Sequence, residues 1–397
     1  MRGGTIWRWA LCAAAAGGAG LLLAACTFSD SLRNDPVRSV WGRGTAPPAQ
    51  SVFFATDRQQ EDGGFGLTWD ATLRCGGATL AIPDGTDLSP NRPDPALASA
   101  PCSDAAAMAA FMARVADAAR PCGRLLLIVH GYNTTFHSAL LHGAQVAMDT
   151  AWPCATLLFS WSSEGRFNRY AADIERSGFA VPPLILLLRA AKAAGLEVNI
   201  LAHSMGARVT LGAAGALCLE GQEQTVNQLI LAAPDVGAEA GNDDFAHLLE
   251  RAMPCIRRAT VYASDNDLAL LTSQSLHGGA LRAGRFTPAS LDYARAHAGE
   301  PGRVDVIDAG LAPGGPVGHA YFMLSYEMAH DMMDVLAGVS IARRAAKGGT
   351  LACTDAKDAA GGGRYALIVA GDRRPDLMAR LIRALWPLSA PASLTSR

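Results

Sequence analysis

The stretch Asn199-Ile200-Leu201-Ala202-His203-Ser204-Met205-Gly206-Ala207-Arg208 decides the fold of this chain. The apolar run from Leu196 to Leu201 predicts a short strand, and the run from Met205 to Leu219, rich in Ala and Leu, predicts a helix. Between them, Ala-His-Ser-Met-Gly is a close variant of the G-x-S-x-G nucleophile elbow, a sharp turn that exposes a serine. Small residues flank the serine because the strand and helix backbones nearly touch there.

Such a turn would lift the Ser204 hydroxyl clear of the sheet and aim the N-terminus of the following helix at a developing oxyanion. The alternative is an ordinary buried strand-to-helix turn, since small-x-Ser-x-small sequences arise readily in a chain with 41 glycines. The predicted strand and helix on either side favour the elbow.

Composition limits the classes of function that need to be considered. The chain has 397 residues, of which 50% are hydrophobic and 18% charged, so it can form a large core. A net charge of −2 gives no electrostatic basis for binding nucleic acid. We find neither metal-ligand spacing nor an internal repeat, and we expect no cofactor.

The first 26 residues are typical of a targeting segment. Arg2 and Arg8 precede the uncharged run Ala10 to Ala25, which is shorter than a usual membrane span. Leu23-Ala24-Ala25-Cys26 resembles the bacterial lipobox, which implies cleavage before Cys26 and attachment of acyl chains such as palmitate. An ordinary secretory peptide and an uncleaved anchor are the alternatives. Thr27, in place of Asp, favours the outer membrane with the protein facing the periplasm.

Residues 27–49 are polar and predict a flexible tether, and residues 50–338 predict an α/β domain in which strands alternate with helices. We expect strands at 51–55, 68–74, 78–82, 124–129, 155–159, 196–201, 228–232, 260–263 and 304–307, and helices after 103–104 and at 182–194, 205–219, 243–252 and 322–337. The long apolar runs predict a mostly parallel sheet covered by helices on both faces. The segment 85–102, with four prolines, predicts a surface loop.

Residues 339–397 are a C-terminal extension of unclear role, which we expect to pack on the domain. Leu351–Thr354 and Arg364–Ala370 predict strands, and Asp376 to Trp386 predicts an amphipathic helix. No chemistry is assigned to this region.

Catalytic partners for Ser204 are expected only on loops that follow strands, because active residues of an open α/β sheet lie beyond the carboxyl ends of its strands. These loops carry His130–Thr134, Asp235, the pair Asp265 and Asp267, and His319. Serine needs a base within hydrogen-bond reach, and the base needs an acid that fixes its tautomer. Ser, then Asp, then His is the order expected of an α/β-hydrolase.

From Val52 to Phe322, roughly two-thirds of its length, the chain resembles a family of bacterial α/β-hydrolases of unassigned function that are related to esterases and lipases. The motifs that carry the resemblance are Val52-Phe53-Phe54-Ala55-Thr56-Asp57-Arg58, Val129-His130-Gly131-Tyr132-Asn133-Thr134, Phe159-Ser160-Trp161-Ser162, Ala202-His203-Ser204-Met205-Gly206, Ala233-Pro234-Asp235-Val236, Tyr262-Ala263-Ser264-Asp265-Asn266-Asp267 and Gly318-His319-Ala320-Tyr321-Phe322. The family usually has proline where Ser162 stands, which concerns the shape of that loop.

We predict Ser204 as the nucleophile, His319 as the base and Asp267 as the acid, with Asp235 as the alternative acid. The backbone N–H groups of Tyr132 and Met205 are expected to form the oxyanion hole. His203, His277 and His330 are rivals to His319 that are less well placed. We expect His130 to be a structural hydrogen-bonding residue and Asn133 to brace its loop.

These predictions make the chain a serine hydrolase that cleaves an ester-type acyl substrate, either a small molecule or a lipid, through an acyl-enzyme. A thioesterase, an amidase and an acyltransferase on the same fold are alternatives. A non-catalytic envelope lipoprotein that binds a partner is the alternative from another class.

Seven of the nine cysteines remain when Cys12 and Cys26 are set aside, and export favours their oxidation. Cys122 and Cys154 each precede an apolar strand, and the two strands are neighbours in the α/β-hydrolase order, so a disulfide between them is within reach. Cys218 and Cys255 are a weaker second pair. The alternative is that all seven are buried thiols.

Overall fold

The structure is a computed structural model, and it describes residues 50–62, 64–80, 97–221, 225–238, 245–285, 303–315, 317–347, 351–353 and 365–367. The expected signal peptide, Cys26, the tether and the helix from Asp376 to Trp386 lie outside these residues. None of the helices in the described ranges combines the length and hydropathy that a membrane span requires.

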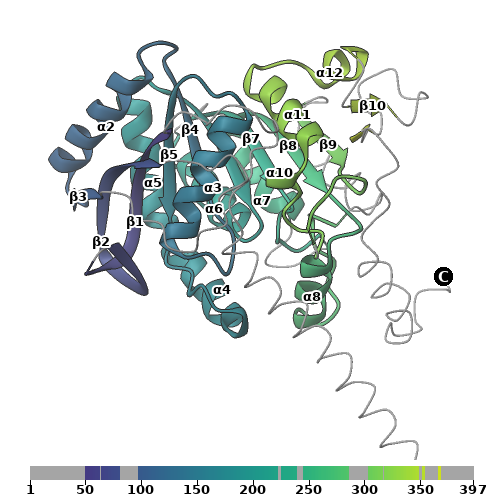
Figure 1. Ribbon diagram of the computed structural model, residues 1–397, viewed down its shortest axis with the longest axis horizontal. Coiled ribbons are helices and arrows are strands. Elements are labelled where there is room, and N and C mark those ends of the chain that lie inside the picture. Colours follow the sequence, from purple (N-terminus) through teal and green to yellow (C-terminus); the bar gives the residue numbers. More distant parts are fainter. Residues whose placement is uncertain are drawn as a thin grey trace, which may run out of the picture.

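Within the described part of the chain, eleven strands form one sheet in the order β10-β11-β9-β8-β7-β6-β4-β5-β1-β2-β3 (Figure 1). In chain order they are β1 (Gln50–Glu61), β2 (Gly64–Leu80), β3 (Ala98–Pro101), β4 (Arg124–Val129), β5 (Ala155–Ser160), β6 (Glu197–His203), β7 (Val226–Ala232), β8 (Ile256–Ala263), β9 (Val304–Asp308), β10 (Leu351–Cys353) and β11 (Tyr365–Leu367). The eight neighbouring strands β11, β9, β8, β7, β6, β4, β5 and β1 pair in parallel. At one edge of the sheet β2 and β3 add antiparallel strands, and at the other edge β10 does.

The central strands are buried on both faces, as their continuous apolar runs predict. In β4, Leu125, Leu127 and Val129 belong to the core on one face, while Leu126 and Ile128 belong to the core on the other. The alternation follows from the two-residue period of a strand. The mostly parallel sheet with helices on both faces, expected from the sequence, is therefore confirmed.

The helices are α2 (Ala105–Ala119), α3 (Phe136–Asp149), α4 (Tyr170–Phe179), α5 (Val181–Ala193), α6 (Gly206–Leu219), α7 (Phe245–Ala252), α8 (Leu268–Leu276), α10 (Tyr321–Leu324), α11 (Tyr326–Leu336) and α12 (Ile341–Lys347), with 3₁₀ turns η1 (Phe167–Arg169) and η2 (Met253–Cys255). The apolar sides of α2, α5, α6 and α7 contribute to one core. Those of α3, α8, α10, α11 and α12 contribute to the other, so the sheet is covered on both faces (Figure 1).

Three local expectations were wrong. β2 is one strand where two were expected, because β3 runs beside it: a Cβ on Gly76 would collide with the carbonyl of Ala98, so glycine permits the close pairing. β3 itself lies in the segment expected to be a surface loop. The helix expected at 322–337 is broken at Ser325, whose hydroxyl accepts a hydrogen bond from the N–H of Met328 and caps α11.

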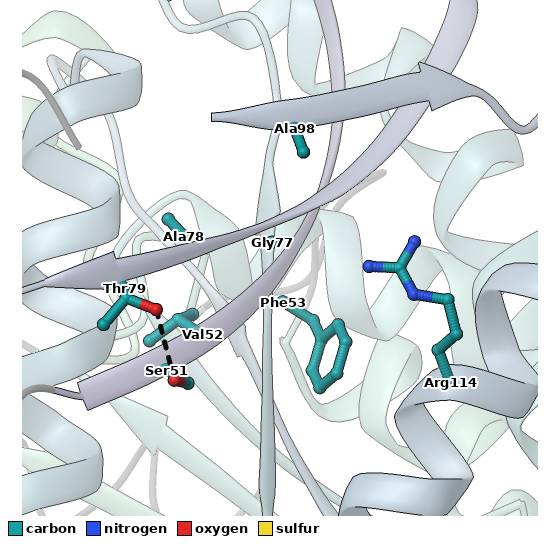
Figure 2. Close-up of a pocket in the computed structure, with 8 residues that line it drawn as sticks. All are labelled: Ser51, Val52, Phe53, Gly77, Ala78, Thr79, Ala98 and Arg114. Atoms are coloured by element: carbon teal, nitrogen blue, oxygen red, sulfur yellow. Dashed lines mark hydrogen bonds between the residues drawn. The ribbon is translucent and has the colours of Figure 1, made fainter. Parts of the chain in front are cut away.

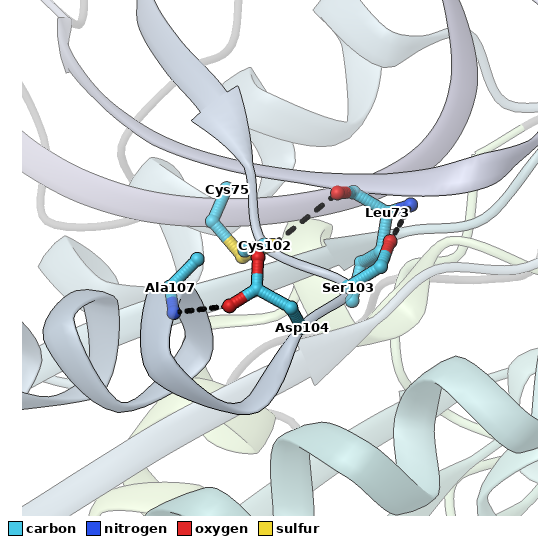
Figure 3. The surroundings of a disulfide bond; sticks show 6 residues. All are labelled: Leu73, Cys75, Cys102, Ser103, Asp104 and Ala107. Carbon is cyan, nitrogen blue, oxygen red and sulfur yellow. Dashed lines mark hydrogen bonds between the residues drawn. A yellow bond between two sulfur atoms is a disulfide. The ribbon is translucent and has the colours of Figure 1, made fainter.

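Three disulfides join described cysteines. Cys75 in β2 is bonded to Cys102, which follows β3, with 5.7 Å between their Cα atoms. Next to this bridge, which was not anticipated, Ser103 accepts a hydrogen bond from the Leu73 N–H and Asp104 caps α2 (Figure 3). Cys122 is bonded to Cys154 and Cys218 to Cys255, with Cα atoms 6.2 Å and 5.5 Å apart. The Cys122–Cys154 bridge lies where β4 and β5 begin, at the edge opposite to Ser204.

The described part of the C-terminal extension packs on the domain. β11 pairs in parallel with β9, and β10 pairs with β11, so both lengthen the central sheet. In α12, Arg344 is buried and donates hydrogen bonds to Asp331 of α11 and Asp305 of β9. The extension therefore contributes both a sheet edge and a buried ion pair to the fold.

Candidate active site

Ser204 lies on a strained turn between β6 and α6. Its φ of 52° falls in the left-handed region that a residue with a side chain rarely adopts. The neighbouring segment holds this conformation, since the Ser204 N–H donates to the carbonyl of Ala232 (3.0 Å) and the Ser204 carbonyl accepts from the N–H of Asp235 (3.1 Å). The residue is 5% exposed. This is the geometry that the elbow motif predicts for its serine.

Two glycines allow the His130 loop to lie directly against the turn. A Cβ on Gly206 would be 2.5 Å from the carbonyl oxygens of Val129 and His130, and a Cβ on Gly131 would be 2.8 Å from the Cβ of Ser204. Such distances require a neighbouring atom to move. The loop that follows β4 therefore packs on the elbow only because both positions lack a side chain.

The structure brings His319 and Asp267 together. Nδ1 of His319 is 2.6 Å from Oδ2 of Asp267, and the Asp267 side chain is 0% exposed while that of His319 is 17% exposed. The other oxygen of Asp267 accepts the Leu270 N–H (2.9 Å) and so caps α8. Capping fixes the carboxylate, and the carboxylate in turn fixes the imidazole.

The loop that carries His319 is bonded to the loop that carries Asp267. The Leu268 N–H donates to the carbonyl of Val317 (2.9 Å). Gly318 has a φ of +68°, and a Cβ there would collide with the carbonyl of Asn266. The two loops are thus held in one register, in which the neighbouring His319 reaches Asp267.

The pKa of His319 is raised above its ordinary value of 6.5. Burial lowers this pKa, but the negative charge of Asp267, its hydrogen bond and the more distant charge of Asp235 together raise it by more. The arrangement therefore favours the imidazolium, the form that a base takes after accepting a proton from serine.

His203 supports His319 rather than competing with it. Its Nε2 lies 3.3 Å from the carbonyl of His319, and its ring stacks on Phe322 with centroids 4.3 Å apart. Burial, followed by the charge of His319, holds the pKa of His203 well below 6.5. The other two rivals lie on helices: His277 caps the C-terminus of α8, and His330 is within α11.

Asp235, the alternative acid, has different partners. Its carboxylate accepts hydrogen bonds from Arg282, Tyr170 and Ser273, each at 2.7 Å. Burial raises the pKa of this carboxyl, but the charge of Arg282 and the three hydrogen bonds bring the net pKa below 3.8. Among the two candidate acids, the structure places Asp267 against the imidazole of His319 and Asp235 against a guanidinium.

The two residues expected to form the oxyanion hole are Met205, next to Ser204 in the chain, and Tyr132, next to the Gly131 that packs on Ser204. Met205 is the N-cap residue of α6, where N–H groups of a first helical turn have no helical acceptor. Tyr132 follows Gly131, the residue that packs on Ser204. Its neighbour Asn133 has a φ of 60°, and its N–H donates to Asp173 (3.3 Å).

A fully buried arginine, which sequence reasoning gave no separate role, holds this loop. Arg58 donates hydrogen bonds to the carbonyls of Thr134 (2.7 Å) and Ser163 (2.8 Å), and so joins the loops after β4 and β5. His130 is structural, as expected: it stacks on Trp161, and burial lowers its pKa to about 3. Arg58 lies within β1, three residues beyond the apolar run that was predicted as a strand at 51–55, and the continued strand leads this charged residue into the interior.

A surface pocket of about 290 Å³ lies away from this site. It is lined by Phe53, Gly77, Ala98 and Arg114, and Figure 2 shows the guanidinium of Arg114, from α2, beside the ring of Phe53. Phe53 lies where β1 begins, whereas Ser204 lies beyond the ends of the parallel strands. The pocket is therefore not part of the candidate active site.

Comparison with solved structures found several esterases with low similarity. An esterase from Rhizomucor miehei is 10% identical over 74% of this chain and 85% of its own, with a TM-score of 0.38. A hyperthermophilic esterase from Pyrobaculum calidifontis is 9% identical over 86% and 100%, with a TM-score of 0.36. The carboxylesterase EstE1 from a metagenomic library is 10% identical over 54% and 79%, with a TM-score of 0.33. Such values say nothing about a shared substrate.

No curated protein matches the chain. A family model described as "alpha/beta hydrolase of unknown function (DUF900)" matches residues 104–336, which include β4 to β9, the elbow serine and the Asp267 and His319 loops. The match covers more than half of the chain, and it agrees with the resemblance that the sequence motifs carried. The chain therefore belongs to this family of α/β-hydrolases of unknown function.

Proposed function

We propose that the protein is a serine hydrolase that cleaves an ester-type acyl substrate through an acyl-enzyme. The observation that carries the proposal is the buried hydrogen bond between Asp267 and His319, on loops at the same edge of the sheet as the strained turn of Ser204. Membership of an α/β-hydrolase family supports it. The proposed roles are nucleophile for Ser204, base for His319 and acid for Asp267.

In the proposed reaction, Oγ of Ser204 attacks the carbonyl carbon and its proton passes to His319. Because Nδ1 of His319 is engaged by Asp267, Nε2 is the nitrogen that accepts this proton. The N–H groups of Tyr132 and Met205 stabilise the oxyanion. The imidazolium then protonates the departing alcohol, and water, activated by the same histidine, releases the acid and frees Ser204.

A panel of p-nitrophenyl esters of increasing acyl length tests the proposal and reports the acyl preference. We expect hydrolysis by the wild-type protein and its loss in Ser204→Ala, by a factor of about 10⁴ or more in kcat. Equal rates for the two proteins would overturn the proposal. Parallel assays with p-nitroanilides, acyl thioesters and an added acceptor alcohol distinguish an amidase, a thioesterase and an acyltransferase, which share this chemistry.

The alternative from another class is a non-catalytic lipoprotein that binds a partner through the same fold. The Asp267–His319 pair favours an enzyme, because a binding module has no need for a base of raised pKa. Under this alternative neither the wild-type protein nor Ser204→Ala would hydrolyse any substrate in the panel faster than buffer does.

We also propose that Cys26 carries acyl chains that anchor the protein to the outer membrane, facing the periplasm, so that lipid esters are within its reach. The support is the lipobox-like Leu23-Ala24-Ala25-Cys26 after an uncharged apolar run. Cys26→Ser should block incorporation of labelled palmitate and leave unprocessed precursor. Normal processing of this variant would identify an ordinary signal peptide instead.

A further inference from the structure

Asp235 belongs to a buried polar cluster that the proposed reaction does not use. The cluster is formed by Asp235, Arg282, Tyr170 and Ser273. Arg282 and Asp235 are a buried ion pair, with side chains 2% and 3% exposed. The Ser273 hydroxyl donates to one carboxylate oxygen and the Tyr170 hydroxyl to the other, and the two hydroxyls are 2.8 Å apart. Both oxygens of the Asp235 carboxylate therefore have hydrogen-bond donors within the cluster.

Three members of the cluster each reach a different part of the candidate active site. The backbone N–H of Asp235 bonds the carbonyl of Ser204. Ser273 lies on α8, whose first turn is capped by Asp267. The ring of Tyr170 packs edge-on against that of Tyr132, with centroids 5.1 Å apart. Asp235 and the two hydroxyl groups that bond its carboxylate are thus connected to the turn of Ser204, to Asp267 and to the loop of Tyr132.

The ion pair also joins the loop after β7, which carries Asp235, to the segment after α8, which carries Arg282. Gly237 and Arg282 form an antiparallel bridge, and the Ala283 N–H donates to the carbonyl of Val236 (2.9 Å). A buried ion pair adds little net stability compared with apolar residues of the same volume, but it can specify one arrangement of the segments that carry it. Because this pair joins two segments, one of which is bonded to Ser204, its main effect is to fix how those segments are arranged.

We propose that Asp235 is a positioning residue of the hydrolase: its carboxylate, held by Arg282, keeps α8 and Tyr170 in place, so that Asp267 and the Tyr132 loop keep their positions around Ser204. The proposal rests on the function proposed above. No proton passes through Asp235, because its partners are a guanidinium and two hydroxyl donors. This role differs from that of an acid, which would contact His319.

The negative charge of Asp235 gives the proposal a signature that packing alone lacks. His319 is influenced by Asp267 at the start of α8, by Asp235 after β7 and by His203 at the end of β6. Both carboxylates favour its imidazolium form. Replacing Asp235 by neutral asparagine leaves the positive charge of Arg282 uncompensated, so the imidazolium should become less favourable.

The test compares Asp235→Asn with the wild type on a p-nitrophenyl ester over a range of pH. We expect kcat to fall about 10- to 100-fold because the catalytic groups shift slightly, with KM changed less than about threefold. The midpoint of the acid limb of kcat/KM should move to lower pH. Asp117→Asn is the matched control: it makes the same chemical change in an exposed ion pair with Arg120 and should leave kcat and the pH profile unchanged.

Tyr170→Phe is the second variant, in case Asp235→Asn fails to fold. It retains the ring against Tyr132 but loses the hydroxyl that donates to Asp235. We expect a smaller loss of kcat, about tenfold, with an unshifted acid limb, because no charge is removed. A wild-type kcat in this variant would overturn the proposal.

Three outcomes separate this proposal from the proposed function. If Asp235→Asn keeps the wild-type kcat and acid limb while Ser204→Ala is inactive, positioning is wrong and the hydrolase stands. If Asp235→Asn is as inactive as Ser204→Ala while Asp267→Asn is almost silent, Asp235 is the acid and positioning is again wrong. If wild type and Ser204→Ala have equal rates, the hydrolase itself fails, and the positioning role fails with it.

Discussion

At the scale of single residues, the two oxygens of Asp267 have separate tasks. Oδ1 accepts the Leu270 N–H at the start of α8, and Oδ2 holds Nδ1 of His319. One side chain therefore both begins a helix and fixes a tautomer.

Replacing Asp267 by asparagine should separate the two tasks. Asparagine is as good an N-cap as aspartate, so at a pH above the pKa of His319 the free energy of unfolding should change little. It offers an amide to Nδ1 and favours the wrong imidazole tautomer, so kcat should fall by about 10³- to 10⁴-fold. Steady-state kinetics on an ester and thermal unfolding of the same sample check both expectations.

Asp267→Ala serves as the comparison variant. It loses the cap as well as the hydrogen bond to His319. Its free energy of unfolding should therefore be about 1 kcal/mol lower than that of Asp267→Asn. Near-normal kcat in both variants would remove Asp267 from the mechanism.

The raised pKa of His319 predicts the pH dependence of activity. The base must be neutral to accept a proton, so kcat/KM should fall as the pH decreases through the pKa of His319, at a midpoint above 6.5. The stabilising effect of the pair runs in the opposite direction. It is fully present below the unfolded pKa of about 6.5 and is lost as the pH rises through the higher folded value.

A pH profile of kcat/KM with an ester that does not ionise in this range checks the midpoint. Asp267→Asn removes the charge that raises the pKa, so its residual activity should show an acid limb displaced to lower pH. A wild-type midpoint at or below 6.5 would contradict the assignment of His319 as the base.

At the scale of elements, the strained positions cluster where the strands end. Three of the four described non-glycine residues with positive φ follow parallel strands: Asn133 follows β4, Ser204 follows β6 and Ala233 follows β7. The fourth, Ala151, follows α3. Strain of this kind persists only where surrounding structure holds it, and it concentrates at functional sites. The loops after three adjacent parallel strands therefore form one preorganised edge.

Gly131→Ala tests whether the loop after β4 must lie against the elbow. The new Cβ would be 2.8 Å from the Cβ of Ser204 and 3.0 Å from Nδ1 of His203, so the loop or the turn has to move. A displacement of this kind should lower kcat by about 100-fold. Overpacking should also lower the free energy of unfolding by about 1–3 kcal/mol.

Gly178→Ala is the matched control, since a Cβ at this exposed position of α4 meets no atom within 4 Å. It should retain full kcat and gain about 0.5 kcal/mol in the free energy of unfolding. If Gly131→Ala behaved in the same way, the close contact between loop and elbow would have no functional meaning.

The strands of the central sheet were predictable from sequence because each is an apolar run ended by polar residues. Arg124 to Val129 was predicted with its observed bounds. The elbow and the Asp267 and His319 loops were placed after the strands predicted at 196–201, 260–263 and 304–307. Helices α3, α4, α8 and α12 were not predicted. Their first residues follow polar loops, and their caps, Thr135 for α3 and Asp267 for α8, could not be distinguished from other loop residues.

At the scale of the whole molecule, the features that could not be predicted from sequence are contacts between segments far apart in the chain. The Cys75–Cys102 bridge and the strand β3 depend on pairing with β2, although a segment of sequence rich in proline separates the two strands. Likewise, the Arg58 contacts to Thr134 and Ser163 join residues 76 and 105 positions apart. Local periodicity holds no information on such pairings, so only the assembled sheet reveals them.

Arg344 tests whether the C-terminal extension is an integral part of the domain. Its guanidinium is buried between Asp331 (2.6 Å) and Asp305 (3.1 Å). Arg344→Ala leaves the buried Asp331 without its arginine partner and Asp305 with Arg258 alone, so the free energy of unfolding should fall by about 3–5 kcal/mol. Denaturant unfolding measures this loss.

Lys347→Ala is the control on the same helix. Lys347 pairs with Asp334 at the surface, with a side chain 54% exposed, so its removal should cost no more than about 1 kcal/mol. Equal, small losses in both variants would mean that α12 is not required for the stability of the domain.

The most direct test of the account is whether Ser204 is a reactive nucleophile. Purified protein is treated with a fluorophosphonate, which phosphonylates activated serines, and the modified peptide is identified by mass spectrometry. We predict one adduct at Ser204 in the wild type, none in Ser204→Ala, and slow labelling in Asp267→Asn and His319→Ala, where the base is misplaced or missing. An unlabelled wild-type protein, or an adduct on another serine with Ser204 untouched, would contradict the proposed mechanism.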